Sequence, residues 1–239
     1  MRPTVHDMST AELTMLADLI HTLDNAAPEC DPRERVLEGV TRLLRADFCA
    51  SFVWNGDTGT NERPLAHNMS GENLDRYLNW FQFRDPITRN LRARRRATPV
   101  RAVMPQSELE KTEFFNEFLR HDGLHHGINL FLFQGDRDLG DLRVWRARGR
   151  PDFQRREIEL LDVLQPHLCR AFARPASPLA ALSARERQVA ELVARGLTDK
   201  DIAATLKIGY ATVRSHLNHG MAKAGCANRA ELAALTQRY

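Results

Sequence analysis

The stretch from Thr198 to Leu217, TDKDIAATLKIGYATVRSHL, holds two short helical patterns separated by only a few residues. Ile202, Ala203 and Leu206 form the apolar face of the first pattern, and the second begins after Gly209. Two helices joined by a three- or four-residue turn that contains glycine make a helix-turn-helix, whose second helix can enter the major groove of DNA. The stretch therefore predicts a DNA-reading motif.

The sequence around this motif predicts a domain of four helices. Residues 183–186 have the spacing of a helix-capping box, residues 198–201 open a second helix, and Gly196 and Gly225 are typical helix ends. Asn228 is expected to cap a last helix. Helices this short bury their apolar seams only against one another, so we expect a compact all-α domain.

The second helix of the motif separates into an inner and an outer face. Val213, Leu217 and positions 220 and 224 follow the spacing of a buried helical stripe. Arg214, Ser215 and Asn218 then face outward, where arginine suits guanine and asparagine suits adenine, while nearby basic and polar side chains meet phosphates. The predicted DNA-binding set, in which Val213 is included as part of the motif, is Lys200, Thr212, Val213, Arg214, Ser215, His216, Asn218, His219 and Lys223.

Charge is unevenly distributed along the 239 residues. From Leu179 onward there are nine Lys and Arg against five Asp and Glu, a net charge of +4, which leaves −1 for the preceding residues. The positive excess coincides with the predicted helix-turn-helix, where an anionic partner is expected.

Composition indicates a cytoplasmic globular protein. No apolar run reaches the length of roughly 18 residues that a membrane helix needs, and the N-terminus has no signal-peptide core. The four cysteines, at positions 30, 49, 169 and 226, stand singly, which favours reduced thiols over a disulfide framework or a zinc site.

The segment 174–181, RPASPLAA, separates two strongly patterned regions and predicts a linker. It divides the chain into a domain over 1–173 and a domain over 182–239. In the first, Asn55-Gly56 follows an apolar run and suggests a hairpin turn, and Pro166 suggests a kink or break in a long helix. Helices are expected near 9–23, 33–45, 71–82, 108–121 and 153–173, and strands near 48–54, 127–134 and 140–147.

These elements predict an α+β protein, with an N-terminal α/β sandwich and a C-terminal all-α domain. Helices that flank a few antiparallel strands form the kind of domain that encloses a small ligand. The amphipathic segment 153–173 is the candidate for an interdomain and dimerising helix.

Residues 182–230 resemble the LuxR-type helix-turn-helix domain of bacterial transcription regulators. The resemblance implies sequence-specific DNA binding by a homodimer, regulated through an N-terminal sensor domain, with RNA polymerase as a further partner. It is carried by Leu182, Arg185, Glu186, Gly196, Leu197, Ile202, Ala203, Leu206, Ile208, Thr212, Val213, Arg214, His216, Lys223, Gly225, Asn228 and Arg229.

The chain departs from this family pattern at three positions. Gly209 stands where the family usually has serine, and Gly220 and Ala224 stand where it usually has Ile and Leu. A glycine inside a helix costs about 1 kcal/mol relative to alanine. We therefore hypothesise that residues 218–224 are loosely held in the free monomer and become firm on dimerisation or DNA binding, which amide exchange would test.

The segment 72–86, ENLDRYLNWFQFRDP, is similar to the autoinducer-binding domain of quorum-sensing members, and the wider N-terminal region resembles a GAF- or PAS-like sensor. Asp85-Pro86 matches the family's Asp-Pro pair, whose aspartate binds the amide of an acyl-homoserine lactone. Tyr77 matches a family tyrosine with a spacing one residue short, whereas Asn73 replaces a tryptophan. The candidate ligand residues are Trp54, Tyr77, Trp80, Phe83 and Asp85; a lactone, another small molecule or no ligand all stay open.

We assign no function to two other groups of residues, a set of histidines and a run of arginines. The histidines at 121, 125 and 126 lack accompanying carboxylate or cysteine spacing, and the arginines at 92 and 94–96 form an ordinary charged run. No phosphate loop, nucleophile elbow or paired metal ligands suggest catalysis, and no cofactor or metal is expected. The alternative hypothesis is that the protein is an adapter that binds a partner protein and whose helical domain does not read DNA. The ligand, the target promoter and the sign of regulation are left open by the sequence.

Overall fold

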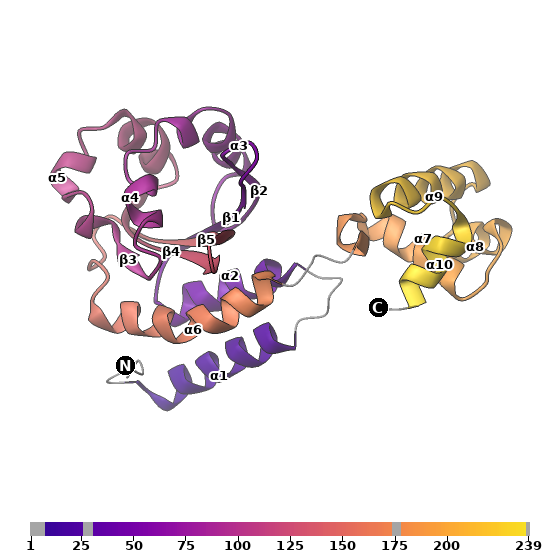
Figure 1. Cartoon of the computed structure of the whole chain (residues 1–239), viewed down its shortest axis with the longest axis horizontal. Helices are drawn as coiled ribbons and strands as arrows, with labels where there is room; N and C mark the ends of the chain where they lie inside the picture. Colours follow the sequence, from indigo (N-terminus) through magenta and orange to yellow (C-terminus); the bar gives the residue numbers. More distant parts are fainter. Residues whose placement is uncertain (1–7, 26–30, 174–177, 238–239) are drawn as a thin grey trace. The chain divides into compact units, whose positions relative to one another are not determined.

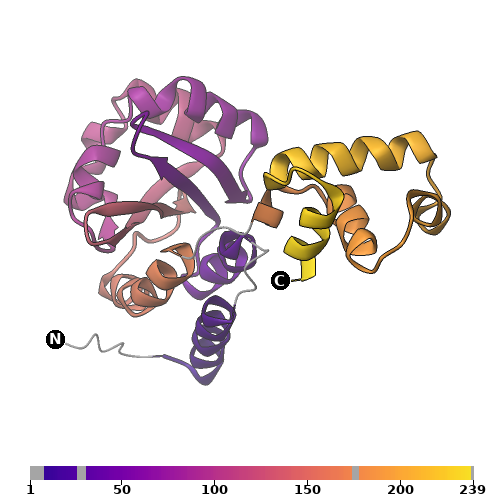
Figure 2. The same cartoon turned by 45° about the vertical axis from the view of Figure 1, so that its right-hand side comes forward.

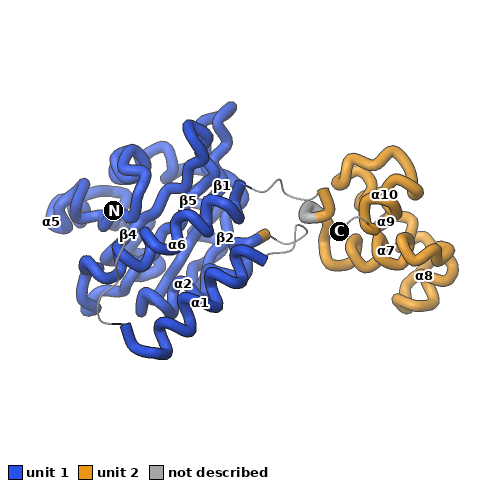
Figure 3. Tube along the Cα trace, turned by 60° about the horizontal axis from the view of Figure 1, so that its bottom comes forward, with its two compact units in different colours: residues 1–26, 32–173 blue, residues 27–31, 174–239 orange. Residues whose placement is uncertain are grey.

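The computed structural model describes residues 8–25, 31–173 and 178–237. The chain divides into two compact units, one formed by residues 1–26 and 32–173 and the other by residues 27–31 and 174–239 (Figure 3).

The N-terminal unit is built on one antiparallel sheet with the strand order β2-β1-β5-β4-β3 (Figure 1). The expected strands near 48–54, 127–134 and 140–147 are present, whereas two further strands escaped sequence analysis. One of these contains Pro64 and carries few apolar residues, and the other has only two residues. The strands are β1 (Phe48–Asn55), β2 (Thr60–His67), β3 (Thr98–Pro99), β4 (Leu124–Gln134) and β5 (Arg137–Ala147).

Helices cover both faces of this sheet (Figure 1). One face packs against α2 (Pro32–Leu43) and α6 (Arg155–Ala173), and α1 (Thr10–Asp24) packs on these two helices as an outer layer. Helix α6 continues through Pro166, so the expected break is wrong. On the other face lie α3 (Gly71–Asn79), α4 (Thr88–Arg92) and α5 (Gln106–Leu109), together with short 3-10 turns at Phe81–Phe83 and Val100–Ala102.

The single helix expected over 108–121 is wrong, because the segment is divided. Helix α5 ends at Leu109, a π-helical turn spans Phe114–Phe118, and a 3-10 turn spans Leu119–His121. Thr112 explains the interruption, since its hydroxyl donates to the carbonyl of Leu109 and accepts from the Phe115 amide, in place of continuous helical bonding.

Strand alternation gives the two faces different characters. In β4, Ile128, Leu130 and Leu132 belong to the apolar cluster shared with α1, α2 and α6. The other face carries aromatic residues but also buried polar ones, among them Asn129 in β4 and Arg143 in β5. This polar centre under the helices is where the N-terminal site lies.

The C-terminal unit contains α7 (Ala184–Ala194), α8 (Asp199–Leu206), α9 (Tyr210–Ala224) and α10 (Arg229–Gln237), shown from a second side in Figure 2. The capping boxes at Ser183 and Thr198 are both formed, and Gly225 ends α9 in the left-handed conformation with φ of 67°. The four expected helices are therefore present.

The expected linker 174–181 differs from the structure in its second half. Pro178–Ala181 forms a 3-10 turn, and Leu179 is buried in the same core as Leu182 and Val189. Positions 174–177 lie outside the described residues.

The described part of the chain bears on two expectations from composition, the state of the cysteines and the presence of a membrane helix. Cys49, Cys169 and Cys226 are free thiols there, and Cys30 lies outside the described residues. Within the same ranges, no helix combines the length and apolar character needed to cross a membrane.

Candidate functional site

Helix α9 presents an inner and an outer face as its sequence spacing predicts. Val213 is 0% exposed and Leu217 4%, and positions 220 and 224 are buried with them. The preceding turn is made by Lys207, which ends α8 with φ of 54°. Gly209 then caps α9 without a side-chain hydrogen bond, as expected for glycine in place of serine.

The outer face of α9 carries most of the predicted DNA-binding residues. Arg214, Ser215 and Asn218 are exposed, and His216 is half-buried beside them. Val213 has to be corrected: because its side chain is fully enclosed by the C-terminal core, it holds α9 in place and cannot contact a base. Lys200, Thr212, His219 and Lys223 are also exposed.

Arg214 is held loosely beside the helix-turn-helix. Its Nη1 lies 3.7 Å from Asp199 Oδ2, and its side chain is 56% exposed. Asp199 has a second cation, because Arg229 forms a close ion pair with its other oxygen. Because Arg229 still pairs with Asp199, Arg214 can move to a base edge without leaving the Asp199 carboxylate unpaired.

Lys223 is engaged within the domain. Its Nζ donates to Glu186 Oε2 at 2.7 Å, and Glu186 is the buried third residue of the Ser183 capping box. Burial by itself raises the pKa of Glu186, but the hydrogen bonds from Lys223 and Ser183 outweigh it and lower that pKa to about 2. The Lys223 ammonium is thus largely neutralised before any phosphate approaches.

Tyr210 is an outer residue that sequence analysis missed. It is 51% exposed at the first position of α9. Positions 210, 214 and 218 are spaced by four residues, so Tyr210 lies on the same line along the helix as Arg214 and Asn218. That spacing was readable in the sequence, but the aromatic ring suggested no contact by itself.

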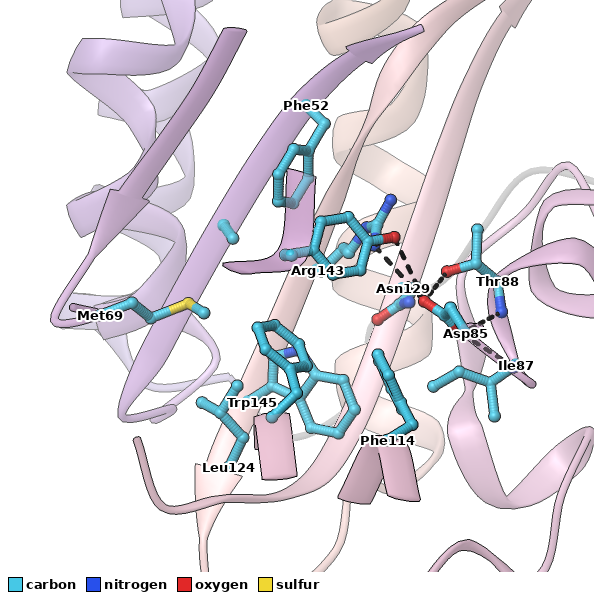
Figure 4. Close-up of a pocket in the computed structure, with 13 residues that line it drawn as sticks. Phe52, Met69, Asp85, Ile87, Thr88, Phe114, Leu124, Asn129, Arg143 and Trp145 are labelled. Carbon is cyan, nitrogen blue, oxygen red and sulfur yellow. Dashed lines mark hydrogen bonds and ion pairs between the residues drawn. The ribbon is translucent and has the colours of Figure 1, made fainter. Parts of the chain in front are cut away.

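The second candidate site is a small enclosed pocket in the N-terminal unit, between the sheet and the helices of its polar-centred face (Figure 4). Its cavity volume is about 20 Å³. Aromatic rings dominate the wall, and those of Tyr77 and Phe52 lie 4.9 Å apart between centroids. The lining residues are Ala50, Phe52, Met69, Tyr77, Asp85, Ile87, Thr88, Phe114, Phe118, Leu124, Asn129, Arg143 and Trp145.

A polar network crosses one side of this pocket. Arg143 Nη2 lies 2.7 Å from Asp141 Oδ2, and Nη1 donates to the Tyr77 hydroxyl, which in turn donates to Asp85 Oδ2 at 3.2 Å. Burial alone would lower the pKa of Arg143, but the charge of Asp141 raises it above its usual value. Desolvation likewise raises the pKa of the Tyr77 hydroxyl.

Asp85 is fully engaged by the chain itself. Its Oδ1 accepts from the amides of Ile87 and Thr88, both at 2.9 Å, and its Oδ2 accepts from the Thr88 hydroxyl at 2.7 Å (Figure 4). The aspartate therefore fixes the turn that leads into α4 and accepts a hydrogen bond from the Tyr77 hydroxyl.

The structure brings together only part of the predicted ligand set. Tyr77 and Asp85 both line the pocket, but Trp54 does not; its ring lies under Arg92 with 3.5 Å between the guanidinium carbon and the centroid. Trp80 and Phe83 have to be corrected, because they are 48% and 64% exposed and absent from the lining. Helix α3 ends at Asn79, so both rings fall on the surface turn that follows it.

Sequence analysis missed Asn129, Asp141 and Arg143. In strands β4 and β5 their alternation with apolar residues has the pattern of a solvent-facing side. An indirect sequence signal for these buried residues was available. Because helices were expected on both sides of the sheet, neither face of a strand could be exposed to solvent, and polar residues on either face had to be buried.

The histidines near this domain's edge make ordinary contacts. His125 Nε2 lies 3.6 Å from Glu110, and His126 Nδ1 lies 3.9 Å from Asp152. No group of three or more metal-binding side chains occurs in the described ranges. His125 instead borders an open groove of about 350 Å³, which shares Leu124 with the wall of the buried pocket.

The two sites together define the class of this protein. One chain carries an α/β domain with an enclosed pocket and a helix-turn-helix domain. Residues 180–236 match the family model described as bacterial regulatory proteins, luxR family. The C-terminal domain therefore matches the LuxR-family helix-turn-helix, and the chain as a whole is similar to bacterial transcriptional regulators.

A curated relative supports the regulator class, and solved structures support the fold. A monoamine regulon transcriptional regulator of Klebsiella aerogenes is 26% identical over 84% of this chain and 88% of its own length. The crystal structure of Escherichia coli SdiA has a TM-score of 0.50 at 18% identity and covers 94% of this chain and 96% of that one. The GAF domain of a Coxiella burnetii phosphoenolpyruvate-protein phosphotransferase has a TM-score of 0.54 at 15% identity, covering 69% of this chain and 95% of that one. The expected GAF-like fold is confirmed.

Proposed function

We propose that this regulator binds a specific DNA site as a homodimer through the outer face of α9, and that a small molecule in the N-terminal pocket controls this binding. The proposal places the protein in the bacterial cytoplasm and gives it a regulatory rather than a catalytic role. RNA polymerase is the further partner that the family resemblance suggests.

One observation carries the DNA-reading part. Arg214, Ser215 and Asn218 are exposed together on α9, while the opposite side of the helix is anchored by buried Val213 and Leu217. A rigid helix with donors and acceptors along its outer line suits base edges in the major groove. Lys200, Thr212 and His219 are the phosphate contacts in this proposal, and we assign Lys223 to Glu186 instead.

The pocket supports control by a small molecule. It is enclosed, mainly aromatic, and crossed by a few fixed polar groups, which are features of ligand sites. Its volume of about 20 Å³ is near that of a single water site, so the long acyl chain of a lactone would demand extensive movement. The Klebsiella relative is named for a monoamine regulon, and we take this name as support for a small-molecule signal.

Selection from a random duplex library tests the function. The full chain should enrich a two-fold symmetric sequence and bind it as two protomers per duplex, with half-sites about 10 base pairs apart or a multiple of this. The rival adapter function predicts no enriched sequence. A selected duplex and a scrambled duplex of equal length, titrated at one salt concentration, separate the two by the ratio of their Kd values.

A further inference from the structure

We infer that the N-terminal pocket recognises a small uncharged molecule whose head group both donates a hydrogen bond to Asn129 and accepts one from it. This inference rests on the proposed control by a small molecule and specifies its chemistry. Carboxamides and lactams carry such a head group.

Asn129 is the lining residue with unused hydrogen-bonding capacity. Its side chain belongs to a residue only 1% exposed, and within the described ranges neither its Oδ1 nor its Nδ2 has a hydrogen-bond partner. It lies in the pocket lining, directly across the β4–β5 ladder from Arg143 (Figure 4). Buried amides of proteins are nearly always paired, so an unpaired one at a pocket wall points to an external partner.

The other polar groups at the wall satisfy one another. Asp85 receives bonds from Thr88, Ile87 and Tyr77, and Asp141 receives Arg143. A ligand that competes for these groups would break existing bonds, whereas a ligand that meets Asn129 breaks none. The amide has one carbonyl oxygen and one NH₂ group, so its best complement offers one donor and one acceptor side by side.

The charges around the pocket favour a neutral ligand. The Arg143 guanidinium carbon lies 4.5 Å from the Phe52 centroid and 4.8 Å from that of Tyr77, so an internal cation already occupies these aromatic faces. A ligand cation would meet Arg143, and a ligand anion would meet the carboxylates of Asp85 and Asp141. Either charge would also lose its hydration in the enclosed site.

The size of the cavity limits the ligand to about one ring. Entry requires side chains to yield, and Met69 and Leu124 are the aliphatic members of the wall best suited to this. Leu124 also lines the open groove of about 350 Å³, so its displacement would connect the two spaces. Met69 has an unbranched side chain that repacks readily.

Asn73 provides a matched control for the role of Asn129. It is 0% exposed in the same domain, but its Nδ2 donates to the Phe118 carbonyl at 3.2 Å and to Asp122 at 3.0 Å. The two asparagines are thus alike in burial and opposite in hydrogen bonding. Replacement by leucine, which has nearly the same shape, should affect them with opposite signs.

Thermal unfolding of the free full chain, followed by tryptophan fluorescence, gives the first test. Asn129→Leu should raise Tm by about 2–4 °C, because an unpaired buried amide is removed, and Asn73→Leu should lower Tm by a similar amount or more. A fall in Tm for Asn129→Leu would show that the amide is satisfied within the protein and would overturn the inference. Asn129→Ala serves if the leucine variant does not fold.

Binding of three probes by the full chain gives the second test. Calorimetry should show benzamide binding with a Kd at least tenfold lower than those of benzoate and benzylamine, and Asn129→Leu should weaken benzamide binding at least tenfold. Equal binding by the variant, preference for either charged probe, or no benzamide binding by the wild type at millimolar concentration would contradict the inference.

A measurement of DNA binding distinguishes a failure of this inference from a failure of the proposed function. The wild-type full chain would be titrated with the selected duplex and with the scrambled duplex, each with and without benzamide. If the wild type itself bound no duplex specifically, the proposed function would fail, while the benzamide series would still decide the chemistry of the pocket.

Discussion

The outer face of α9 and the N-terminal pocket are built in opposite ways. The α9 surface comes from one helix of 15 residues, and its side chains are exposed and loosely held. The pocket draws on strands β1, β4 and β5 and on helical segments far apart in sequence, and its charged groups are buried and tightly paired, whereas the Asn129 amide is not. Under the proposed function, the surface for a large charged partner stays open, whereas the pocket for a small molecule is organised in advance by its own ion pairs.

This difference has an energetic consequence. Changes on the α9 surface should affect binding more than folding, because the side chains there give up little when DNA is absent. Changes in the pocket should affect folding first, since each buried charge depends on its neighbours.

Arg143→Met should cause the largest loss. It leaves the carboxylates of Asp141 and Asp85 buried without their cation, at a cost of about 3–5 kcal/mol in the free energy of unfolding. Urea denaturation followed by tryptophan fluorescence measures this, because Trp54, Trp80 and Trp145 all lie in the N-terminal domain.

Arg95→Met is the matched control for the buried arginine. Arg95 pairs with Asp136 at 3.2 Å, but both side chains are largely exposed, so the loss should stay below about 1 kcal/mol. Equal losses of unfolding free energy in the two variants would contradict the view that the pocket is preorganised and differs from an ordinary surface.

Lys223→Met should destabilise the C-terminal domain by about 1–2 kcal/mol at neutral pH, because Glu186 loses a charged donor that is itself half-exposed. The folded-state pKa of Glu186 is about 2, below the ordinary 4.5, so its contribution is complete above pH 4.5 and is lost as the pH falls toward 2. Amide exchange in α7 and α9 should therefore show the difference from wild type shrinking over that range.

Lys200→Met separates the structural lysine from a DNA-contacting one. Lys200 is exposed at the start of α8, so its loss should leave stability nearly unchanged but reduce the salt slope of DNA binding by about one, whereas Lys223→Met should keep the slope. A reduced slope for Lys223→Met with unchanged stability would return Lys223 to the phosphate contacts first expected.

Gly220→Ala should have a small stabilising effect, a gain of about 1 kcal/mol in the free energy of unfolding. A methyl group there would lie 3.7 Å from both Leu182 and Glu186, which is ordinary contact. Slower amide exchange over 218–224 is the readout, and Gly225→Ala is the control with opposite sign, because Gly225 has φ of 67°. A destabilised Gly220→Ala would mean that α9 needs the close approach of its backbone at this point.

The sequence predicted the C-terminal domain well because its signals are local. Ser183 and Thr198 lie three residues from the acids that complete their capping boxes, and Val213, Leu217 and position 220 follow one helical period. No distant part of the chain is needed to decide these features. The prediction was wrong in naming Val213 both as a core residue and as a DNA contact, and it did not anticipate the contact of Lys223 with Glu186.

The pocket could be predicted only in part because its geometry is long-range. Tyr77 and Asp85 were found through a local motif, but Arg143 lies 66 residues from the tyrosine that it contacts. Trp80 and Phe83 were chosen as aromatic residues near that motif, and the early end of α3 places them on the surface. Asn73, which replaces a family tryptophan, serves a structural role through Phe118 and Asp122.

Base preference after Arg214→Ala tests the central claim most directly. The full-length variant and the wild type would each select duplexes from the same random library, with Lys200→Met as the phosphate control. We predict that Arg214→Ala loses preference at one base pair per half-site and about 1–3 kcal/mol of affinity for the wild-type sequence, while Lys200→Met keeps every preference. An unchanged consensus for Arg214→Ala, with affinity lowered equally for all sequences, would contradict the claim that α9 reads the bases.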